Sequence, residues 1–262
     1  MMNFLRSKGK RSERTVEVIP YTVMAPHYDF IMNHVDYVNW ASHAIRLADE
    51  HNRSGHALTD LACGTGKFAF ELARRGYKVT GADGSAEMIQ VAKNHAASLH
   101  LDVEFFVRSL TETPPSNEQD IILCLYDSTN YLLEQEDLLT FFSKVRTALK
   151  QNGIFVFDIS TERNSLDHFD DYSDTEPFQT GVYRRHAWYD AEERLQHNEF
   201  EFFLHDDTNV YHEHHIQRIW SIEQIVSCLE VTGWQLLGTY ADYTMQPGSE
   251  SNDRVHFTAE PV

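Results

Sequence analysis

The segment from Asp60 to Gly66, with the sequence DLACGTG, constrains the fold of this chain more than any other stretch. It follows a short apolar run at residues 57–62 that predicts a buried strand, and it precedes a helical pattern at residues 67–75. Gly64 and Gly66 let the backbone turn sharply and let a ligand approach closely. The backbone N–H groups at the start of the helix favour a negative group of that ligand.

An acidic residue, Asp83, ends the next predicted strand at residues 78–82, 17 residues after Gly66. In open α/β sheets an acid at this position hydrogen-bonds the two ribose hydroxyls of a nucleoside ligand, and ligands bind at the carboxyl ends of the strands. Either feature alone is also compatible with a ligand-free turn and a helix-capping acid. Their combination predicts a nucleoside site, although the spacing Gly64-x-Gly66-x-x-Ala69 also fits the NAD fingerprint.

Strands and helices alternate along most of the chain, which predicts βαβ units and a parallel sheet. The strand expected at residues 120–125 is apolar from Ile121 onward, as a strand buried on both faces should be. Ser85 and Ser221 are predicted N-caps of two helices. The seven expected strands of this unit lie at residues 57–62, 78–82, 103–107, 120–125, 153–159, 234–241 and 254–259, and the expected helices at residues 67–75, 86–98, 135–149 and 222–231.

The pattern changes after Ile159, because the next strands have no helices between them. Residues 181–190, 195–205 and 209–219 alternate as strands and are rich in Tyr, Phe, Trp and His. They predict an antiparallel insertion. We therefore expect a basic flexible tail at residues 1–18, an α/β domain at residues 19–161 and 220–262 that begins with a helical region at residues 21–51, and a β insertion at residues 162–219.

The charge balance restricts the partners of the chain. Acidic residues outnumber basic residues by 40 to 22, giving a formal net charge of -18. Such a surface repels nucleic-acid phosphates and anionic lipid head groups, so neither nucleic acid nor membrane is expected as a partner. The oligomeric state is not readable from these features.

A cytoplasmic location is expected from two further features. The three cysteines, Cys63, Cys124 and Cys228, are far apart and odd in number, which indicates reduced thiols. No apolar stretch approaches the roughly 18 residues of a membrane span, and no apolar segment typical of a signal peptide follows the basic N-terminus.

Residues 58–93, LTDLACGTGKFAFELARRGYKVTGADGSAEMIQVAK, resemble motif I and the following acidic strand of class I S-adenosylmethionine (AdoMet)-dependent methyltransferases. Residues 120–132 resemble the fourth-strand motif of this family, and residues 149–161 resemble its fifth strand. Residues 21–32 resemble the N-terminal aromatic segment of its small-molecule branch. The resemblance implies a Rossmann-like fold, with a seven-stranded, mostly parallel sheet and an antiparallel β insertion after strand 5.

The resemblance also implies a function: transfer of a methyl group from AdoMet to N or O of a small molecule by in-line displacement. Ala62 departs from the family, where many members have glycine, and Ser109 stands where an acid is common. Grouped by the part of AdoMet that they would contact, the implied residues are Asp60, Ala62, Gly64 and Gly66 for the methionine part, Asp83, Gly84 and Met88 for ribose and adenine, Ser109 and Leu110 for the adenine edge, Leu125 and Tyr126 for the sulfonium end, and Tyr21 and Tyr28 as a cover.

Methyl transfer from a sulfonium requires mainly alignment of the reacting atoms and exclusion of water. An amine that loses its proton before attack often needs no base, whereas a hydroxyl acceptor would more often want one. Candidate bases are Tyr126, His186 and His27, although histidines in such positions are more often structural or exposed.

A metal site is not expected. His212 and His214 share one face of a predicted strand and could offer two ligands, but no third ligand, His215 included, has convincing spacing. Without a metal, these histidines are expected to belong to a solvated, polar face of the strand. The aromatic residues of the insertion either pack a half-buried sheet or line a substrate pocket, or do both; they are Tyr183, Trp188, Tyr189, Phe200, Phe202, Phe203, Tyr211 and Trp220.

Two other functions remain open from the residues alone. An NAD(P)-dependent oxidoreductase would fit the glycine spacing, but no recognisable hydride-transfer pair such as Tyr-x-x-x-Lys is found. A non-catalytic nucleoside-binding protein on the same fold is the other alternative.

Overall fold

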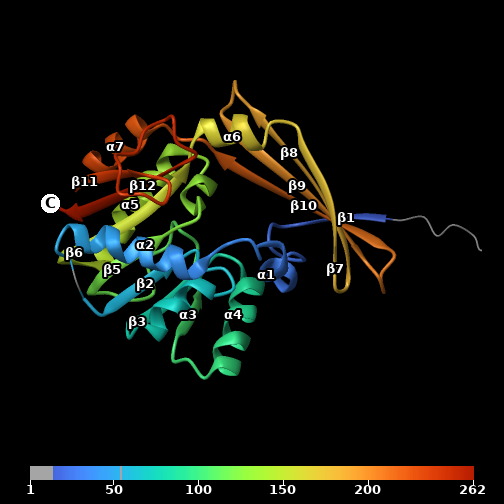
Figure 1. Cartoon of the computed structure of the whole chain (residues 1–262), viewed down its shortest axis with the longest axis horizontal. Helices are drawn as coiled ribbons and strands as arrows, with labels where there is room; N and C mark the ends of the chain where they lie inside the picture. Colours follow the sequence, from blue (N-terminus) through green and yellow to red (C-terminus); the bar gives the residue numbers. More distant parts are fainter. Residues whose placement is uncertain (1–13, 54) are drawn as a thin grey trace, which may run out of the picture.

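The computed structural model describes residues 14–53 and 55–262, which build two β-sheets (Figure 1). The larger sheet has seven strands: β2 (Ala57–Leu61), β3 (Lys78–Asp83), β4 (Glu104–Val107), β5 (Gln119–Cys124), β6 (Leu149–Ser160), β11 (Trp234–Ala241) and β12 (Arg254–Pro261). Their order is β11-β12-β6-β5-β2-β3-β4. Strands β2 to β6 pair in parallel, and β12 is antiparallel to both of its neighbours. The predicted Rossmann-like sheet is confirmed.

Helices cover both faces of this sheet, so the α/β part has three layers (Figure 1). Helices α2 (Tyr37–Glu50), α3 (Lys67–Arg74) and α4 (Ala86–Leu99) pack on one face, and α5 (Gln135–Ala148) and α7 (Ile222–Val231) pack on the other. The predicted caps are present: the hydroxyls of Ser85 and Ser221 accept from the backbone N–H groups of Met88 and Gln224. The cap at Ser85 starts α4 shortly after Asp83, the last residue of β3.

The N-terminal region is less continuous than its aromatic pattern predicts. Residues 21–51 contain the 3-10 turn η1 (Ala25–His27), the short helix α1 (Tyr28–Ile31) and then α2. Pro26 stands in the first turn of η1, and Asp36 starts a new helix by accepting from the backbone N–H of Asn39. The helical region is therefore interrupted between α1 and α2, and α2 packs against the sheet.

The second sheet has five strands in the order β1-β10-β9-β8-β7 and extends to one side of the α/β part (Figure 1). Its strands are β1 (Arg14–Val18), β7 (Tyr172–Phe178), β8 (Gly181–Asp190), β9 (Leu195–Leu204) and β10 (Asn209–Arg218), and α6 (Glu162–His168) leads into it from β6. Strands β8 to β10 lie where the sequence predicted them.

Two strands of this sheet differ from the prediction. Strand β7 is an exposed edge strand that contains Pro177 and lacks apolar alternation, so its sequence gives little strand signal. Strand β1 pairs in parallel with β10, although residues 14–18 were expected in the flexible tail. Five residues that pair with a strand almost two hundred positions away leave no local signal. The rest of the predicted tail lies outside the described residues.

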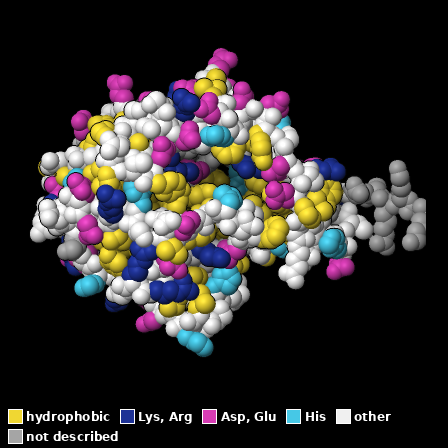
Figure 2. All heavy atoms as spheres, viewed as in Figure 1, with side chains coloured by type: hydrophobic (Ala, Val, Ile, Leu, Met, Phe, Trp, Pro, Cys, Tyr) yellow, Lys and Arg dark blue, Asp and Glu magenta, His cyan; other side chains and the backbone are white. Residues whose placement is uncertain are grey.

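Side chains alternate between the two faces of the second sheet. The buried inner face carries Tyr183, Ala187, Phe200, Phe202, Glu213 and His215, whereas the outer face carries His186, Trp188, His197, His212 and His214. On the face seen in Figure 2, hydrophobic side chains gather and the surface is hollowed where this sheet meets the α/β part. Among the described residues, no helix combines the length and the apolar character that crossing a bilayer requires.

Candidate active site

The turn after β2 has positive φ at three residues: Ala62 at 55°, Gly64 at 54° and Gly66 at 83°. A Cβ added to Gly66 would lie 2.8 Å from Cζ of Phe70 and 2.9 Å from Cζ of Phe105, so only glycine fits there. Ala62 adopts the left-handed conformation despite its Cβ, at a cost of about 1–2 kcal/mol. The left-handed residues and the tight packing at Gly66 therefore fix the backbone conformation of this turn, which ends at the N-terminus of α3.

Asp83 lies against this turn. Its Oδ2 accepts a hydrogen bond of 2.9 Å from the backbone N–H of Gly64, and its Oδ1 accepts one of 2.8 Å from that of Ser85. Burial raises the pKa of Asp83, while the hydrogen bonds from Ser85 and Gly64 lower it. The two segments identified in the sequence thus face one crevice at the carboxyl ends of β2 and β3.

Asp60 adds a second carboxyl group to the crevice. The side chain is 3% exposed, and its Oδ2 is buried with no hydrogen-bond partner among the described residues. Burial, and to a smaller extent the charge of Asp83, raise the pKa of Asp60 to about 8. A buried carboxyl oxygen without a partner costs free energy that a cationic ligand would recover, so the crevice suits a cation.

A pocket joins this crevice to the N-terminal segment and to the end of β5. Six of the residues that the family resemblance implied line it: Tyr28, Asp60, Ala62, Gly64, Leu125 and Tyr126. The sequence reasoning missed the others, although Thr65 lies within the glycine turn and Lys67 and Phe68 directly follow it, so their positions could have revealed them. The remaining lining residues are Val35, Tyr37, Trp40 and Cys63.

The other implied residues, Asp83 among them, do not line this pocket. The ring of Tyr21 packs edge-on against Tyr28 with centroids 6.0 Å apart. Met88 is buried in α4, Gly66 ends the turn, and a Cβ on Gly84 would lie 3.9 Å from Cα of Ser109. Leu110 packs against the hydrophobic core beneath α5 and α7.

An acid stands beside Ser109 after all. The carboxylate of Glu112 accepts a 2.8 Å hydrogen bond from the backbone N–H of Ser109, and this bond lowers the pKa of Glu112. Ser109 occupies a position where an acid is common in the family, and Glu112 supplies a carboxylate at the same turn instead. Its offset of three residues explains why the motif did not reveal it.

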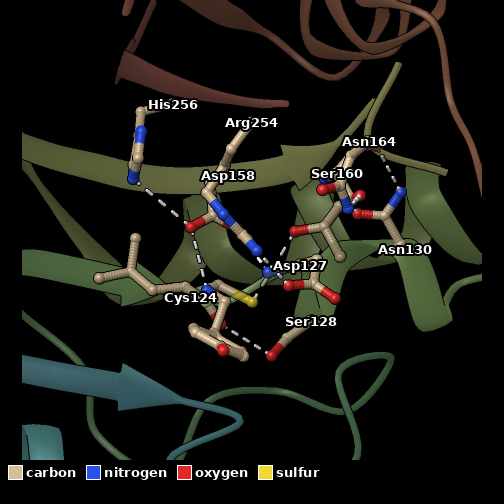
Figure 3. A network of polar contacts seen from close by, with 12 residues as sticks. Cys124, Asp127, Ser128, Asn130, Asp158, Ser160, Asn164, Arg254 and His256 are labelled. Atoms are coloured by element: carbon tan, nitrogen blue, oxygen red, sulfur yellow. Dashed lines mark hydrogen bonds and ion pairs between the residues drawn. The ribbon is translucent and has the colours of Figure 1, made fainter. Parts of the chain in front are cut away.

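A buried ionic network holds the loop after β5 (Figure 3). Tyr126 and Asp127 have positive φ values of 64° and 52°, and the carboxylate of Asp158 accepts from their backbone N–H groups at 3.0 and 2.6 Å. Arg254 of β12 donates to Asp158 at 3.0 Å and to Asp127 at 2.7 Å. Burial alone lowers the pKa of Arg254, but the charges of Asp158 and Asp127 raise it overall.

This network also positions aromatic walls of the pocket. The guanidinium of Arg254 lies 5.0 Å from the ring centroid of Tyr126 and 5.3 Å from that of Trp40. Both rings line the pocket. Asp127, Asp158 and Arg254 were missed as site residues, because their partners come from strands far apart in the sequence.

The candidate bases differ in position. Tyr126 lines the pocket, and burial raises its pKa to about 12. His186 lies on the outer face of the second sheet, 3.4 Å from the exposed Asp171, and the ring of His27 packs on Phe178 with centroids 4.3 Å apart. The structure therefore does not bring His186 or His27 to the pocket.

The histidine cluster of β10 is divided between two environments. His212 and His214 share the outer face, where His212 contacts Glu17 at 2.6 Å, whereas His215 points to the buried inner face. Within residues 14–53 and 55–262, no group of three His, Cys, Asp or Glu side chains is arranged to hold a metal ion.

The strand order β11-β12-β6-β5-β2-β3-β4, together with a glycine turn and an acid at the carboxyl ends of neighbouring strands, defines a Rossmann-like cofactor-binding protein. Residues 58–153 match the family described as "Methyltransferase domain". A protein of Geobacillus sp. (strain WCH70), named only as a methyltransferase, is 32% identical over 92% of this chain and 99% of its own length. YqeM of Bacillus subtilis (strain 168), named in the same way, is 28% identical over 92% of this chain and 96% of its own.

Similarity to solved structures supports the same family. An AdoMet-dependent methyltransferase from Clostridium acetobutylicum ATCC 824 superposes with a TM-score of 0.78 at 25% identity, covering 92% of this chain and 98% of its own. The chain belongs to the class I AdoMet-dependent methyltransferases. This assignment decides the choice of cofactor that the glycine spacing had left open.

Proposed function

We propose that this protein transfers a methyl group from AdoMet to a nitrogen or oxygen atom of a small molecule by in-line displacement. The observation that carries the proposal is the crevice in which the unpartnered Oδ2 of Asp60 lies beside Asp83 and the glycine turn. AdoMet carries an ammonium group and a sulfonium, and when bound it supplies a methyl group that is already activated.

The chain supplies the groups that would hold this cofactor. Asp60 would accept from the ammonium group and Asp83 from the ribose hydroxyls, each through charge-assisted hydrogen bonds. Ala62, Gly64 and Gly66 would let the backbone approach the methionine part. The remaining proposed contacts, carried over from the family resemblance, are Gly84, Met88, Ser109, Leu110, Leu125, Tyr126, Tyr21 and Tyr28.

The aromatic residues around the pocket would exclude water and interact with the cationic cofactor. Tyr28, Tyr37, Trp40 and Tyr126 line the space between the glycine turn and the loop after β5. Aromatic faces attract cations, and a dry pocket keeps the acceptor and the methyl carbon aligned. Alignment of this kind supplies on the order of 7–11 kcal/mol toward a displacement reaction.

Three observations support a small acceptor. The insertion sheet turns a buried, partly polar face toward the α/β part, and the surface is hollowed where the two meet (Figure 2). The net charge of -18 disfavours nucleic acid. The fold is shared with KedS8 of Streptoalloteichus sp., titled a sugar N-methyltransferase, at a TM-score of 0.71 and 16% identity, covering 88% of this chain and 91% of that chain.

We further propose a cytoplasmic location, because Cys63, Cys124 and Cys228 are all free and buried.

Calorimetric titration with AdoMet, its demethylated product and NAD tests the cofactor site. Mass-spectrometric detection of the demethylated product with a panel of amines, amino acids, amino sugars and phenols then tests the reaction. AdoMet binding followed by acceptor-dependent product formation supports the proposal. AdoMet binding without turnover on any member would favour a non-catalytic nucleoside-binding protein, and NAD binding alone would contradict the cofactor assignment.

A further inference from the structure

Four side chains from three separate parts of the chain form an unbroken hydrogen-bonded series. The hydroxyl of Tyr21 lies 2.6 Å from that of Tyr131, which lies 3.0 Å from Nδ1 of His215. Nε2 of His215 lies 3.1 Å from Oε2 of Glu213. Tyr21 belongs to the N-terminal segment, Tyr131 ends the 3-10 turn η2 (Ser128–Tyr131) after β5, and both other residues belong to β10.

The buried end of the series fixes its direction. Glu213 is fully buried, and its two oxygens accept from the backbone N–H groups of Tyr21, Val23 and Met24 at 2.7, 2.6 and 2.9 Å. Hydrogen bonds from three backbone N–H groups favour the carboxylate form of Glu213, and a carboxylate can only accept, so we assign the proton between the two side chains to Nε2 of His215.

Each remaining step follows from that assignment. With its proton on Nε2, a neutral His215 offers Nδ1 as an acceptor, so Tyr131 donates to it. The oxygen of Tyr131 then accepts from the hydroxyl of Tyr21. The oxygen of Tyr21 keeps a free lone pair, which is the open end of the series.

That open end lies on the side of the methyl-transfer pocket. The ring of Tyr21 packs against Tyr28, which lines the pocket together with Leu125 and Tyr126, and Tyr131 lies five residues after Tyr126. On the inner face of the insertion sheet, the ring of Phe200 lies 5.4 Å from that of His215. The series therefore leads from a residue that packs on the pocket wall to a buried carboxylate.

We propose that Tyr21, Tyr131, His215 and Glu213 form a proton relay that takes up the proton released by the methyl acceptor. This rests on the proposed methyl transfer. As the acceptor atom bonds to the methyl carbon, the carbon–sulfur bond breaks and its electron pair passes to sulfur. The acceptor atom gives its proton to Tyr21, Tyr21 gives its own to Tyr131, and Tyr131 gives its own to Nδ1 of His215. The imidazolium so formed is paired with the carboxylate of Glu213.

Within this relay only Tyr21 would touch the acceptor, and the other three are positioning residues. The charged and titratable groups around His215 are Glu213 on its own strand, Tyr21 and Tyr131 from the elements packed on it, Arg185 of β8 beside Phe200, and His214 on the outer face of β10. The guanidinium of Arg185 donates to Oδ1 of Asn198 at 2.5 Å. A purely structural role, in which Glu213 only fastens the N-terminal segment to β10, is the competing explanation.

Tyr131→Phe separates these roles, because it removes the middle hydroxyl and leaves every bond to Glu213 in place. Tyr172→Phe is the control: it removes a hydroxyl from β7 of the same sheet, where that hydroxyl donates to Asp174 at 3.0 Å. With an acceptor from the panel, Tyr131→Phe and His215→Gln should lower kcat about a hundredfold and abolish the acid limb of the pH profile. Tyr172→Phe should leave kcat unchanged, and none of these variants should change the affinity for AdoMet. An unaltered kcat and pH profile in Tyr131→Phe would overturn the relay.

A second measurement needs no acceptor. Nitrogen NMR of histidine-labelled protein at about pH 9, where ordinary imidazoles are neutral, should show His215 with its proton on Nε2, assigned by the loss of its signals in His215→Gln. A proton on Nδ1 would reverse the series and contradict the proposal. If no acceptor is found and the expected tautomer is present, the proposed function fails while the hydrogen-bond direction of the relay stands.

Discussion

The backbone N–H of Gly64 donates a hydrogen bond of 2.9 Å to Oδ2 of Asp83, so the turn after β2 is joined directly to the end of β3. Because Ser85 holds the other carboxylate oxygen at 2.8 Å, both oxygens are oriented by backbone groups. A carboxylate has about four acceptor positions, so each oxygen retains capacity for a further donor. The group that would bind ribose is therefore positioned by the turn that would bind the methionine part.

Removing this carboxylate should weaken cofactor binding. Asp83→Ala deletes a pair of charge-assisted hydrogen bonds to ribose, and we expect the Kd for AdoMet to rise about tenfold or more. Calorimetric titration measures this change. Asp102→Ala, which removes one exposed acid elsewhere, serves as the control for net charge and should leave the affinity unchanged. An unchanged Kd in Asp83→Ala, with its folding verified by thermal unfolding, would refute the ribose assignment.

The glycine at the end of the turn should tolerate no larger residue. Gly66→Ala combines a φ of 83° with contacts of 2.8 and 2.9 Å to Phe70 and Phe105, and we expect it to lower the free energy of unfolding by about 2–5 kcal/mol. Gly76→Ala has a similar φ of 92° but open space around its Cβ, so it should cost only about 1–2 kcal/mol. Urea denaturation compares the two. Equal losses would show that the aromatic contacts at Gly66 do not matter.

The ionic network under the loop after β5 should contribute strongly to stability. Arg254→Met leaves the buried carboxylate of Asp158 and the half-buried carboxylate of Asp127 without their cation, which should cost about 3–5 kcal/mol. Arg163→Met breaks the exposed pair with Asp167 and should cost about 0–1 kcal/mol. Chemical denaturation at neutral pH distinguishes them. If Arg254→Met were as stable as Arg163→Met, the network would not be what holds the strained loop.

The parts of the fold that could be predicted from sequence are those with a local signal. The glycine turn and Asp83 each follow an apolar strand, and the rule that ligands bind at strand ends brings them together without any knowledge of packing. The strands β8 to β10 were visible because their side chains alternate between a buried and an exposed face.

The features that could not be predicted from sequence depend on contacts between segments that are distant along the chain. Arg254 reaches Asp127 across 127 positions, and Glu213 binds the backbone of Tyr21 across 192. No periodicity in a single sequence records such pairs. Strand β1 was assigned to a tail for the same reason, since only its pairing with β10 makes it a strand.

The buried carboxyl of Asp60 should make stability and cofactor binding depend on pH in opposite directions. Its pKa is raised from 3.8 to about 8 by burial, so the folded, ligand-free protein holds a proton there that the unfolded chain releases above 3.8. The stability that this proton provides is fully present below the unfolded pKa and is lost as the pH rises through about 8. An ammonium group bound at Asp60 requires the carboxylate, so AdoMet affinity should instead increase up to the same pH.

Asp60→Asn should therefore flatten the dependence of Tm on pH in the absence of AdoMet and weaken AdoMet binding. Thermal unfolding with and without AdoMet across this range checks both effects, and a ligand-free Tm that follows the same pH curve in Asp60→Asn as in the wild type would exclude Asp60 as the titrating group.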